Sequence, residues 1–460
     1  MSRPATRHPF RTALAIGTAA VVCAGLAGCG GGGSSNGGSK KLTVTYQQFG
    51  DSQVQKNFLT SVKKEFEASH KGITVDLQPI SASEDDYYTK LQLQMRSAKT
   101  SPDLVYEDTF LINSDIDAGY LTPLDSHLDT WADWKQFQPT AKKAAQALNG
   151  KTYGVPDGTD TRALWYNKAL FAKAGLPSEW KPKSWDDILT AARAIKAKLP
   201  GVTPINVYAG TGVGEAATMQ GFEMMLYGTQ DTLYNASDKK WVVGTKGFTD
   251  ALTFLKTLQS EGLTPSSKDM LQPTWSNTVP QKLLPAGKLA ISLDGSWVSN
   301  NWLKSGAAPW SQWASTMGTA AMPTQDGGGK GAISMSGGWT WAIPKNSDNQ
   351  KAAWDLVALL GSKKRELEWA IKNVQIPVRE DVASDPSYAK ANPTNKFFAS
   401  LVPITQYRPA YSVYPRISKE IQTATESVVT GDATPAKAAQ QYDEQVKGIV
   451  GKDITSSSGS

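Results

Sequence analysis

The sequence predicts an α/β protein with more than one lobe, each lobe built on a mostly parallel sheet flanked by helices. Three observations lead to this prediction. Strand-like and helix-like hydrophobic patterns alternate along the chain from Leu42 onward. The 460 residues are enough for two or three domains. With 40% hydrophobic residues the chain can form a sizeable core, and it is predicted to be globular rather than disordered.

The first predicted elements alternate between strand and helix. Residues 42–46 alternate large hydrophobic side chains with threonine, as a strand does, and residues 73–77 repeat that alternation. Residues 54–66 place Val and Phe side chains every four positions, and residues 87–95 restore the same helical period. A short apolar segment at 103–106 completes the series. This strand–helix–strand–helix–strand order predicts parallel pairing with helices on the faces of the sheet.

Two later helices carry start signals. Ser184 and Ser347 each precede, by three residues, a side chain that can reach back to the backbone, which is typical of helix N-termini. Gly361 stands where the second of these helices should end. Three tryptophans within apolar runs are predicted core residues: Trp165, Trp354 and Trp369.

Residues 1–28 are predicted to be a signal peptide. Three arginines precede an uncharged run at 12–28 that is too short and too rich in small residues for a spanning helix. Leu26-Ala27-Gly28-Cys29 resembles the lipobox of bacterial lipoproteins, which implies that Cys29 is lipidated and becomes the first mature residue. The Gly/Ser tract that follows fits a flexible tether, so residues 29–41 are predicted to be the lipidated cysteine and a linker.

Removal of this segment changes the charge and the thiol content. The net charge of +6 falls to +3, because residues 1–28 hold three arginines and no acidic residue. Cys23 leaves with the signal and Cys29 would carry lipid, so we exclude disulfides, thiolate metal sites and cysteine nucleophiles. No basic cluster remains to dominate phosphate binding, which excludes nucleic acid as a partner.

The mature sequence offers little for catalysis. Only His70 and His127 remain for a His-based triad or a multi-histidine metal site, and no Gly-x-Ser-x-Gly occurs from residue 42 onward. Residues 327–331 lack the Ser or Thr of a phosphate loop, and residues 210–215 lack the last glycine of a dinucleotide fingerprint. We therefore expect no catalytic residue, no metal and no cofactor.

Polar and aromatic side chains follow several predicted strands and turns. In open α/β sheets ligands gather at the carboxyl ends of strands, where aromatic faces can stack on sugar rings and carboxylates or amides can bond to hydroxyls. Each of these residues could also be an ordinary cap, turn or core residue. The candidates are Gln47, Gln48, Phe49, Asp51, Glu107, Asp108, Trp297 and Trp339.

A tyrosine cluster near residue 410 suggests a ferric site, but the acidic partners of such a site are missing. Arg408 and Arg416 also lie close to Tyr407, Tyr411 and Tyr414. Packing or sugar contact is the preferred interpretation.

A series of short motifs carries a family resemblance. Their order and spacing is similar to that of the extracellular solute-binding proteins of ABC importers, in the large sugar-binding family that includes maltose-binding proteins. The resemblance spans residues 42 to about 452. The motifs are Tyr153-Gly154-Val155-Pro156, residues 163–168, Leu176-Pro177, residues 182–187, 287–290, 294–297, 337–339, 342–345 and 376–379.

The resemblance implies a two-lobe fold of the periplasmic-binding-protein type, class II, with the ligand between the lobes. Residues 42–160 plus 334–377 would form lobe 1, and residues 161–333 plus 378–455 lobe 2. Residues 456–460 would be a flexible tail. The chain would cross between lobes near 158–163, 333–338 and 377–379.

The resemblance also implies a set of sugar-contacting residues, with Trp297 as the stacking platform of lobe 2. Glu107 stands where maltose binders often have an aromatic residue, which favours more polar contacts. The full set is Gln48, Phe49, Glu107, Asp108, Asp160, Trp297, Gly338, Trp339, Arg379 and Tyr411.

By this resemblance the protein captures a sugar, of di- or oligosaccharide size, without transforming it. It then delivers the sugar to ABC permease subunits, with the ATPase on another chain. We expect a monomer, held on the outer face of the cell membrane by lipid on Cys29. Two alternatives stay open: a secreted carbohydrate-active enzyme, whose paired carboxylates and aromatic platforms would look similar, and a sugar-sensing surface lipoprotein without an importer.

Overall fold

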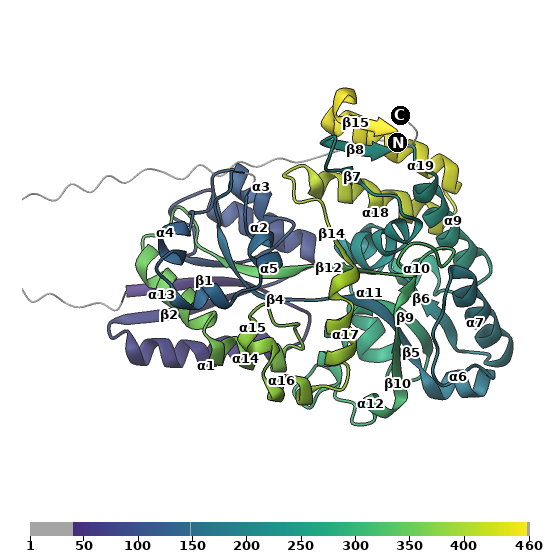
Figure 1. Ribbon diagram of the computed structural model, residues 1–460, viewed down its shortest axis with the longest axis horizontal. Coiled ribbons are helices and arrows are strands. Elements are labelled where there is room, and N and C mark those ends of the chain that lie inside the picture. The colour runs from purple at the N-terminus through teal and green to yellow at the C-terminus, as the bar shows by residue number, and fades with distance from the viewer. Residues whose placement is uncertain (1–39, 148, 458–460) are drawn as a thin grey trace, which may run out of the picture. The chain divides into compact units, whose positions relative to one another are not determined.

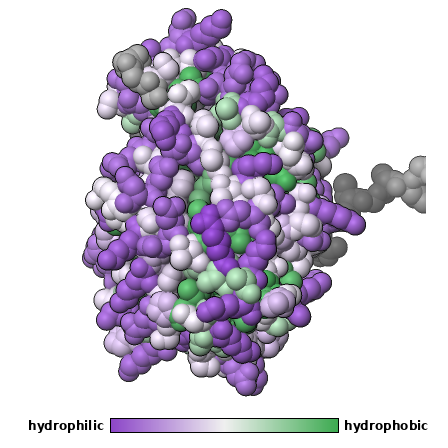
Figure 2. Space-filling model, turned by 90° about the vertical axis from the view of Figure 1, so that its right-hand side faces the viewer, coloured by the Kyte–Doolittle hydropathy of each residue, from purple (hydrophilic) through white to green (hydrophobic). Residues whose placement is uncertain are grey.

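The computed structural model describes residues 40–147 and 149–457, which form an α/β fold with four mixed or small sheets. The predicted signal peptide and Cys29 lie outside the described residues. Within the described ranges, no helix combines the length and the apolar character needed to cross a membrane. In the view of Figure 2 most surface side chains are hydrophilic, and hydrophobic ones occur in small groups among them.

The first large sheet has five strands, of which three are parallel. Strand β1 pairs in parallel with β2 and β3, whereas β13 runs antiparallel to both β3 and β4. The strand order is β2 (Ile73–Ser81), β1 (Lys40–Gln48), β3 (Leu104–Asp108), β13 (Gly338–Ala342) and β4 (Gly154–Thr159).

The second large sheet has four strands and is mainly antiparallel. Strand β5 is antiparallel to β10 and β9, and β6 is parallel to β9. The strand order is β10 (Met317–Ala320), β5 (Arg162–Asn167), β9 (Leu289–Gly295) and β6 (Thr203–Asn206). The two-lobe α/β fold is confirmed, but the expectation of mostly parallel sheets is corrected. The strands that bring the chain into each sheet from the other one run against their neighbours: β13 is antiparallel to β3 in the first sheet, and β5 is antiparallel to β9 in the second.

We call the five-stranded sheet with its helices the first lobe and the four-stranded sheet with its helices the second lobe (Figure 1). The helices of the first lobe are α1 (Val54–Ser69), α2 (Glu84–Met95), α3 (Ile112–Asp117), α4 (Asp125–Leu128), α5 (Pro139–Ala144), α13 (Gln350–Leu360), α14 (Lys363–Lys372), α15 (Glu380–Ala383) and α16 (Pro386–Ala391). The helices of the second lobe are α6 (Lys168–Ala174), α7 (Trp185–Lys198), α8 (Met224–Leu226), α9 (Lys246–Ser260), α10 (Ser267–Met270), α11 (Trp275–Thr278), α12 (Trp313–Thr316), α17 (Asn395–Ser400), α18 (Tyr414–Thr430) and α19 (Pro435–Val450).

Two three-stranded sheets complete the fold. One joins β11 (Met322–Pro323), β12 (Ala332–Ser336) and β14 (Thr405–Tyr407), and the other joins β15 (Thr455–Ser457), β8 (Lys240–Val243) and β7 (Tyr234–Asn235). Strand β15 pairs in parallel with β8 through Ser457. The predicted tail boundary at 456 is therefore corrected, because residues 456 and 457 are still in a strand.

The hydrophobic periods of the sequence become buried helix faces. In α1 the side chains at four-residue spacing, Phe58, Val62 and Phe66, are all buried. The predicted core tryptophans Trp165 and Trp369 are buried, and Trp354 is half-buried against the first-lobe core. The alternating order of the first five elements is confirmed.

The two predicted helix starts differ in outcome. Helix α7 begins directly after Ser184, but the Ser184 side chain makes no capping hydrogen bond within the described part of the chain. Instead the Asp187 carboxylate accepts from the backbone N–H of Lys183 at 2.7 Å. Helix α13 begins two residues later than a cap at Ser347 requires. The Ser347 hydroxyl donates to Asp103 at 2.7 Å and accepts from the Asn349 N–H at 3.0 Å, in a turn that precedes the helix. Its predicted end before Gly361 is confirmed.

Three chain segments run side by side where the lobes join. Thr159 and Ile376 exchange backbone hydrogen bonds of 2.9 and 2.8 Å. The Thr159 hydroxyl donates to the Gly337 carbonyl at 2.7 Å, and the Gly337 N–H donates to Asp160 Oδ1 at 2.8 Å. Gly338 has φ +150°, and a Cβ there would lie 2.5 Å from the Gly158 carbonyl, so only glycine fits this crossing.

The third crossing between the lobes lies later in the chain than residue 378, where the last segment of lobe 2 was predicted to begin. Helices α15 and α16 both pack on α14 of the first lobe. The chain reaches the second lobe at Asn392, whose side-chain amide donates to the Ser299 hydroxyl at 2.9 Å.

Candidate ligand-binding cleft

A cavity of about 490 Å³ lies between residues of the two lobes. This volume is typical of small-molecule sites. The first lobe contributes the ends of β1 and β3, the start of α2 and the start of β13. The second lobe contributes the 211–216 segment, residues 273–281 and the turn after β9. The wall is rich in amide and hydroxyl groups, which can donate to and accept from a polyhydroxylated ligand.

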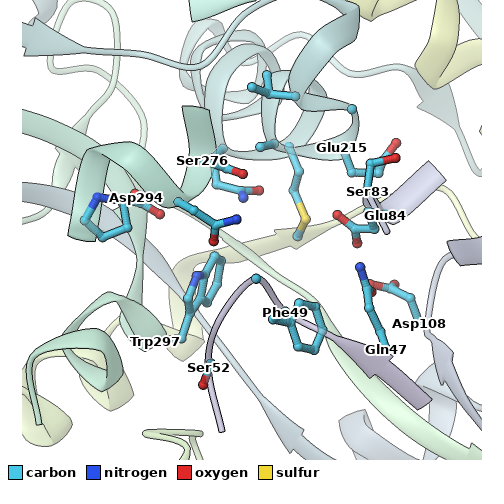
Figure 3. Close-up of a pocket in the computed structure, with 18 of the residues that line it drawn as sticks. Gln47, Phe49, Ser52, Ser83, Glu84, Asp108, Glu215, Ser276, Asp294 and Trp297 are labelled. Carbon is cyan, nitrogen blue, oxygen red and sulfur yellow. The ribbon is translucent and has the colours of Figure 1, made fainter. Parts of the chain in front are cut away.

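Four aromatic residues line the cavity: Phe49, Tyr106, Trp297 and Trp339. The Trp297 ring lies so close to Gly295 that a Cβ at that position would collide with it, and the Arg162 guanidinium carbon is 4.7 Å from the ring centroid. Trp339 stacks on Tyr106 at 4.7 Å with an angle of 11° between the rings. The Phe49 ring meets Trp339 edge-on at 5.4 Å and is 41% exposed. Both Trp297 and Phe49 are visible in Figure 3.

The loop that carries Phe49 is held by the neighbouring Gln48. Its side-chain amide donates to the backbone carbonyls of Gly50, at 3.3 Å, and Ser52. These bonds fold the chain back immediately after β1, which presents Phe49 to the cavity.

A buried ion-pair triad connects the two lobes at the cavity wall. Arg408 Nη2 donates to Asp108 Oδ1 of the first lobe at 2.7 Å, and Nη1 donates to Glu215 Oε2 of the second lobe at 3.1 Å. The three side chains are 4–6% exposed. The Arg408 guanidinium also lies over the Phe110 ring at 4.2 Å. A second pair, Asp160 with Arg162, lines the same cavity and is also buried.

Two further carboxyl groups of the cavity wall have strongly raised pKa values. Burial, together with the charges of Asp108 and Glu215, raises the pKa of Glu84 to about 8. Burial raises the pKa of Asp294 to about 6, although Tyr208 donates to it at 2.7 Å and Gly295 N–H at 2.8 Å. Burial also raises the pKa of Asp108 and of Glu215, against the opposing charge of Arg408.

These shifts predict how stability depends on pH. Raised carboxyl pKa values mean that the native state binds more protons than the unfolded chain between about pH 4.5 and pH 8, so the free energy of unfolding rises as the pH falls through this range. We expect a higher Tm for the ligand-free protein at pH 6 than at pH 8, measured by calorimetry at constant ionic strength. A higher Tm at pH 8 would contradict this. The groups with raised pKa values include Glu84, Asp157 and Glu223 at about 8, Asp115 at about 7 and Asp294 at about 6.

The structure brings seven of the ten predicted site residues to the cavity. They come from both lobes and from the crossings. These residues are Gln48, Phe49, Asp108, Asp160, Trp297, Gly338 and Trp339.

The other three predicted residues do not line the cavity, each for a structural reason. Glu107 alternates with Tyr106 and Asp108 along β3, so it points to the opposite face, where it lies beside Asp115. Arg379 is buried in the first lobe, where it donates to Asp133 at 3.0 Å and to Asp381 at 2.8 Å. Tyr411 packs on Tyr234, with 4.4 Å between ring centroids.

Several charged residues of the cavity were missed by the sequence analysis. Glu84 and Asp85 begin α2 behind Ser83, whose hydroxyl accepts from the Asp86 N–H at 3.3 Å. This Ser-acid pattern could have placed a helix start at the carboxyl end of β2. Arg162, Glu215 and Arg408 carried no comparable signal. Glu215 follows the glycine-rich 210–214 segment, which lines the cavity through residues 211–214.

The fold and this cavity define a two-lobe α/β binding protein whose ligand site is enclosed by residues of both lobes. The family model described as bacterial extracellular solute-binding protein matches residues 43–365. The chain belongs to this family, which confirms the resemblance seen in its sequence motifs. The family consists of binding proteins rather than enzymes.

Individual relatives agree with this assignment. The galactooligosaccharide-binding protein of Bacillus subtilis is 23% identical over 357 residues, covering 77% of this chain and 78% of that protein. The solute-binding protein of Thermotoga lettingae, solved with α-D-tagatose, has a TM-score of 0.77 at 26% identity and covers 89% of this chain and 100% of its own. Maltose-bound MalE3 of T. maritima has the same TM-score and coverage at 22% identity, which shows the fold.

Proposed function

We propose that this protein is the extracytoplasmic substrate-binding component of an ABC importer and that its ligand is a sugar, in particular a di- or oligosaccharide. The observation that carries the proposal is the composition of the cavity. It combines Trp297 and Phe49 with amide, hydroxyl and carboxyl groups from both lobes. Aromatic faces suit sugar rings and the polar groups suit hydroxyls.

The mechanism is capture by lobe closure. A ligand that contacts both lobes favours the conformation in which they are close, because it gains contacts there that it lacks in an open one. Direct contacts between the lobes already exist beside the cavity: Asn300 donates to Asn373 at 2.6 Å, in addition to the Arg408 triad. The three crossing segments provide the connection about which the lobes would rotate.

Delivery and anchoring complete the proposal. The ligand-bound form would dock as a monomer on the permease subunits of the importer, and lipid on Cys29 would hold the protein at the outer face of the cell membrane. Mass spectrometry of the protein from a membrane fraction tests the anchor. The proposal requires a diacylated N-terminal Cys29, and an unmodified N-terminus elsewhere in the chain would contradict it.

A thermal-shift screen against mono-, di- and oligosaccharides tests the ligand class. A sugar that binds the native state, added at a free concentration of roughly 100 times its Kd, should stabilise the protein by about 2.7 kcal/mol and raise its Tm. Absence of a shift with every sugar would contradict the proposal. Steady cleavage of an oligosaccharide would favour the enzyme alternative. Unchanged uptake of the bound sugar after deletion of the gene would favour the surface sensor.

A further inference from the structure

The Trp297 ring occupies a place that the neighbouring strand leaves empty. Gly295 lies directly opposite Arg162 in the antiparallel pair of β9 and β5, so side chains at these two positions share one face of the sheet. Gly295 has no side chain, and the six-membered ring of Trp297 takes the space in which its Cβ would lie. The indole therefore lies beside the Arg162 side chain on that face.

The Arg162 guanidinium covers this ring. Its carbon lies 4.7 Å from the ring centroid, which is the distance of a cation–π contact. Both side chains line the cavity, but Arg162 is only 5% exposed, whereas Trp297 is half-buried (Figure 3). The pair therefore offers a ligand mainly the indole. Arginine suits this place, because its flat guanidinium can stack on a ring while its N–H groups bond to other neighbours.

The guanidinium is itself fixed by the segments that join the lobes. Its Nη1 donates to Asp160 and to the Met335 carbonyl, the latter at 3.3 Å. The Arg162 backbone N–H donates to the Ser334 hydroxyl, and that hydroxyl donates to the Arg162 carbonyl, both at 2.9 Å. Asp160 in turn accepts from the Gly337 N–H at 2.8 Å. These bonds leave the guanidinium little freedom, so it can hold the indole in one orientation.

We infer that Arg162 and Gly295 are positioning residues of the ligand site, which together fix the Trp297 indole as a flat platform for a sugar ring. The inference rests on the proposed sugar-binding function and assigns further residues to it. A ring that is already oriented loses less conformational entropy when a ligand stacks on it, so a fixed platform binds more tightly than a mobile one. Because Arg162 acts through Trp297, its substitution should matter only where the indole is present.

The variant Arg162→Lys tests the contact with the indole. Lysine keeps a positive charge for Asp160 but has no planar group to stack on the ring. Calorimetry with a sugar found in the thermal-shift screen should show at least fivefold weaker binding than in the parent protein. In the Trp297→Ala background the same substitution should change the affinity less than twofold, whereas in the Trp339→Ala background the fivefold loss should remain. An unchanged affinity in Arg162→Lys, or an equal loss in both backgrounds, overturns the inference.

The variant Gly295→Ala tests the place of the ring without removing a charge. Its methyl group would displace the indole, so the same dependence on Trp297 is expected. Arg365→Lys is the matched control for Arg162→Lys. Arg365 is an equally buried, ion-paired arginine that does not line the cavity and lies over no aromatic ring among the described residues. Its substitution should leave sugar affinity as in the parent protein, and a loss equal to that of Arg162→Lys overturns the inference.

The position of the indole can also be followed without a sugar. In protein labelled with fluorotryptophan, the fluorine resonance of Trp297 is the one that is missing from the variant Trp297→Phe. In the ligand-free protein this resonance should shift in Arg162→Lys and in Gly295→Ala and stay in place in Arg365→Lys. An unmoved resonance in the first two variants overturns the inference, whether or not a sugar binds. A moved resonance in a protein that binds no sugar contradicts the sugar-binding function but not the positioning of the ring.

Discussion

Arg408→Ala is expected to lower the free energy of unfolding by about 3–5 kcal/mol, the usual cost of removing one partner from a buried ion pair. The substitution leaves Asp108 and Glu215 buried without their cation, and no other basic side chain of the described residues donates to either carboxylate. It also removes the guanidinium from the Phe110 ring. Urea denaturation of the ligand-free variant at pH 7 measures the loss.

Arg379→Ala serves as the matched control for this prediction. Arg379 is as buried as Arg408, but its partners Asp133 and Asp381 are 41% and 27% exposed and can be solvated when it is removed. Its loss of stability should therefore be smaller. A triple variant that makes the whole triad uncharged, Arg408→Met with Asp108→Asn and Glu215→Gln, should recover much of the loss. A loss of stability below about 1 kcal/mol in Arg408→Ala would contradict this prediction. It would mean that water reaches the two carboxylates, so that neither becomes an uncompensated buried charge.

The first lobe was predictable from the sequence because its signals are local. The strand and helix periods of residues 42–106 depend on side chains a few positions apart, and all five elements form as the pattern indicates. The antiparallel strand β13 was not predictable in this way. It enters the first sheet from more than 200 residues further along the chain, and its pairing depends on the path between the lobes.

The difference between local and long-range signals also explains which residues of the candidate site could be predicted. Trp297 and Phe49 follow strands directly, so a local rule locates them at the cavity. Arg408 was noted only as a neighbour of the tyrosine cluster, because its partners, Asp108 and Glu215, are distant in the sequence and meet it only in the fold. Glu107 shows a different error. The strand was expected to end at residue 106 but continues through Asp108, so its alternation turns Glu107 to the other face of the sheet.

Trp297→Ala is expected to weaken sugar binding at least tenfold, about 1.4 kcal/mol, while leaving the fold intact. Its ring is half-buried and lies against Gly295 and the Arg162 guanidinium. It lines the cavity on the side away from Glu84 and Asp108 (Figure 3). Removing it deletes the aromatic face that the second lobe offers to a sugar ring. Calorimetry with a sugar identified in the thermal-shift screen measures the change.

Trp310→Ala is the matched control, because Trp310 is a half-buried tryptophan of the same lobe that packs on Trp302 at 5.4 Å and does not line the cavity. It should bind sugar like the parent protein. Trp339→Ala should also weaken binding at least tenfold but with lower stability, since Trp339 stacks on Tyr106 in the first-lobe core. Unchanged affinity in both Trp297→Ala and Trp339→Ala would remove stacking from the mechanism. Loss in Trp339→Ala alone would place the stacking contact on the first lobe and leave only polar contacts for the second.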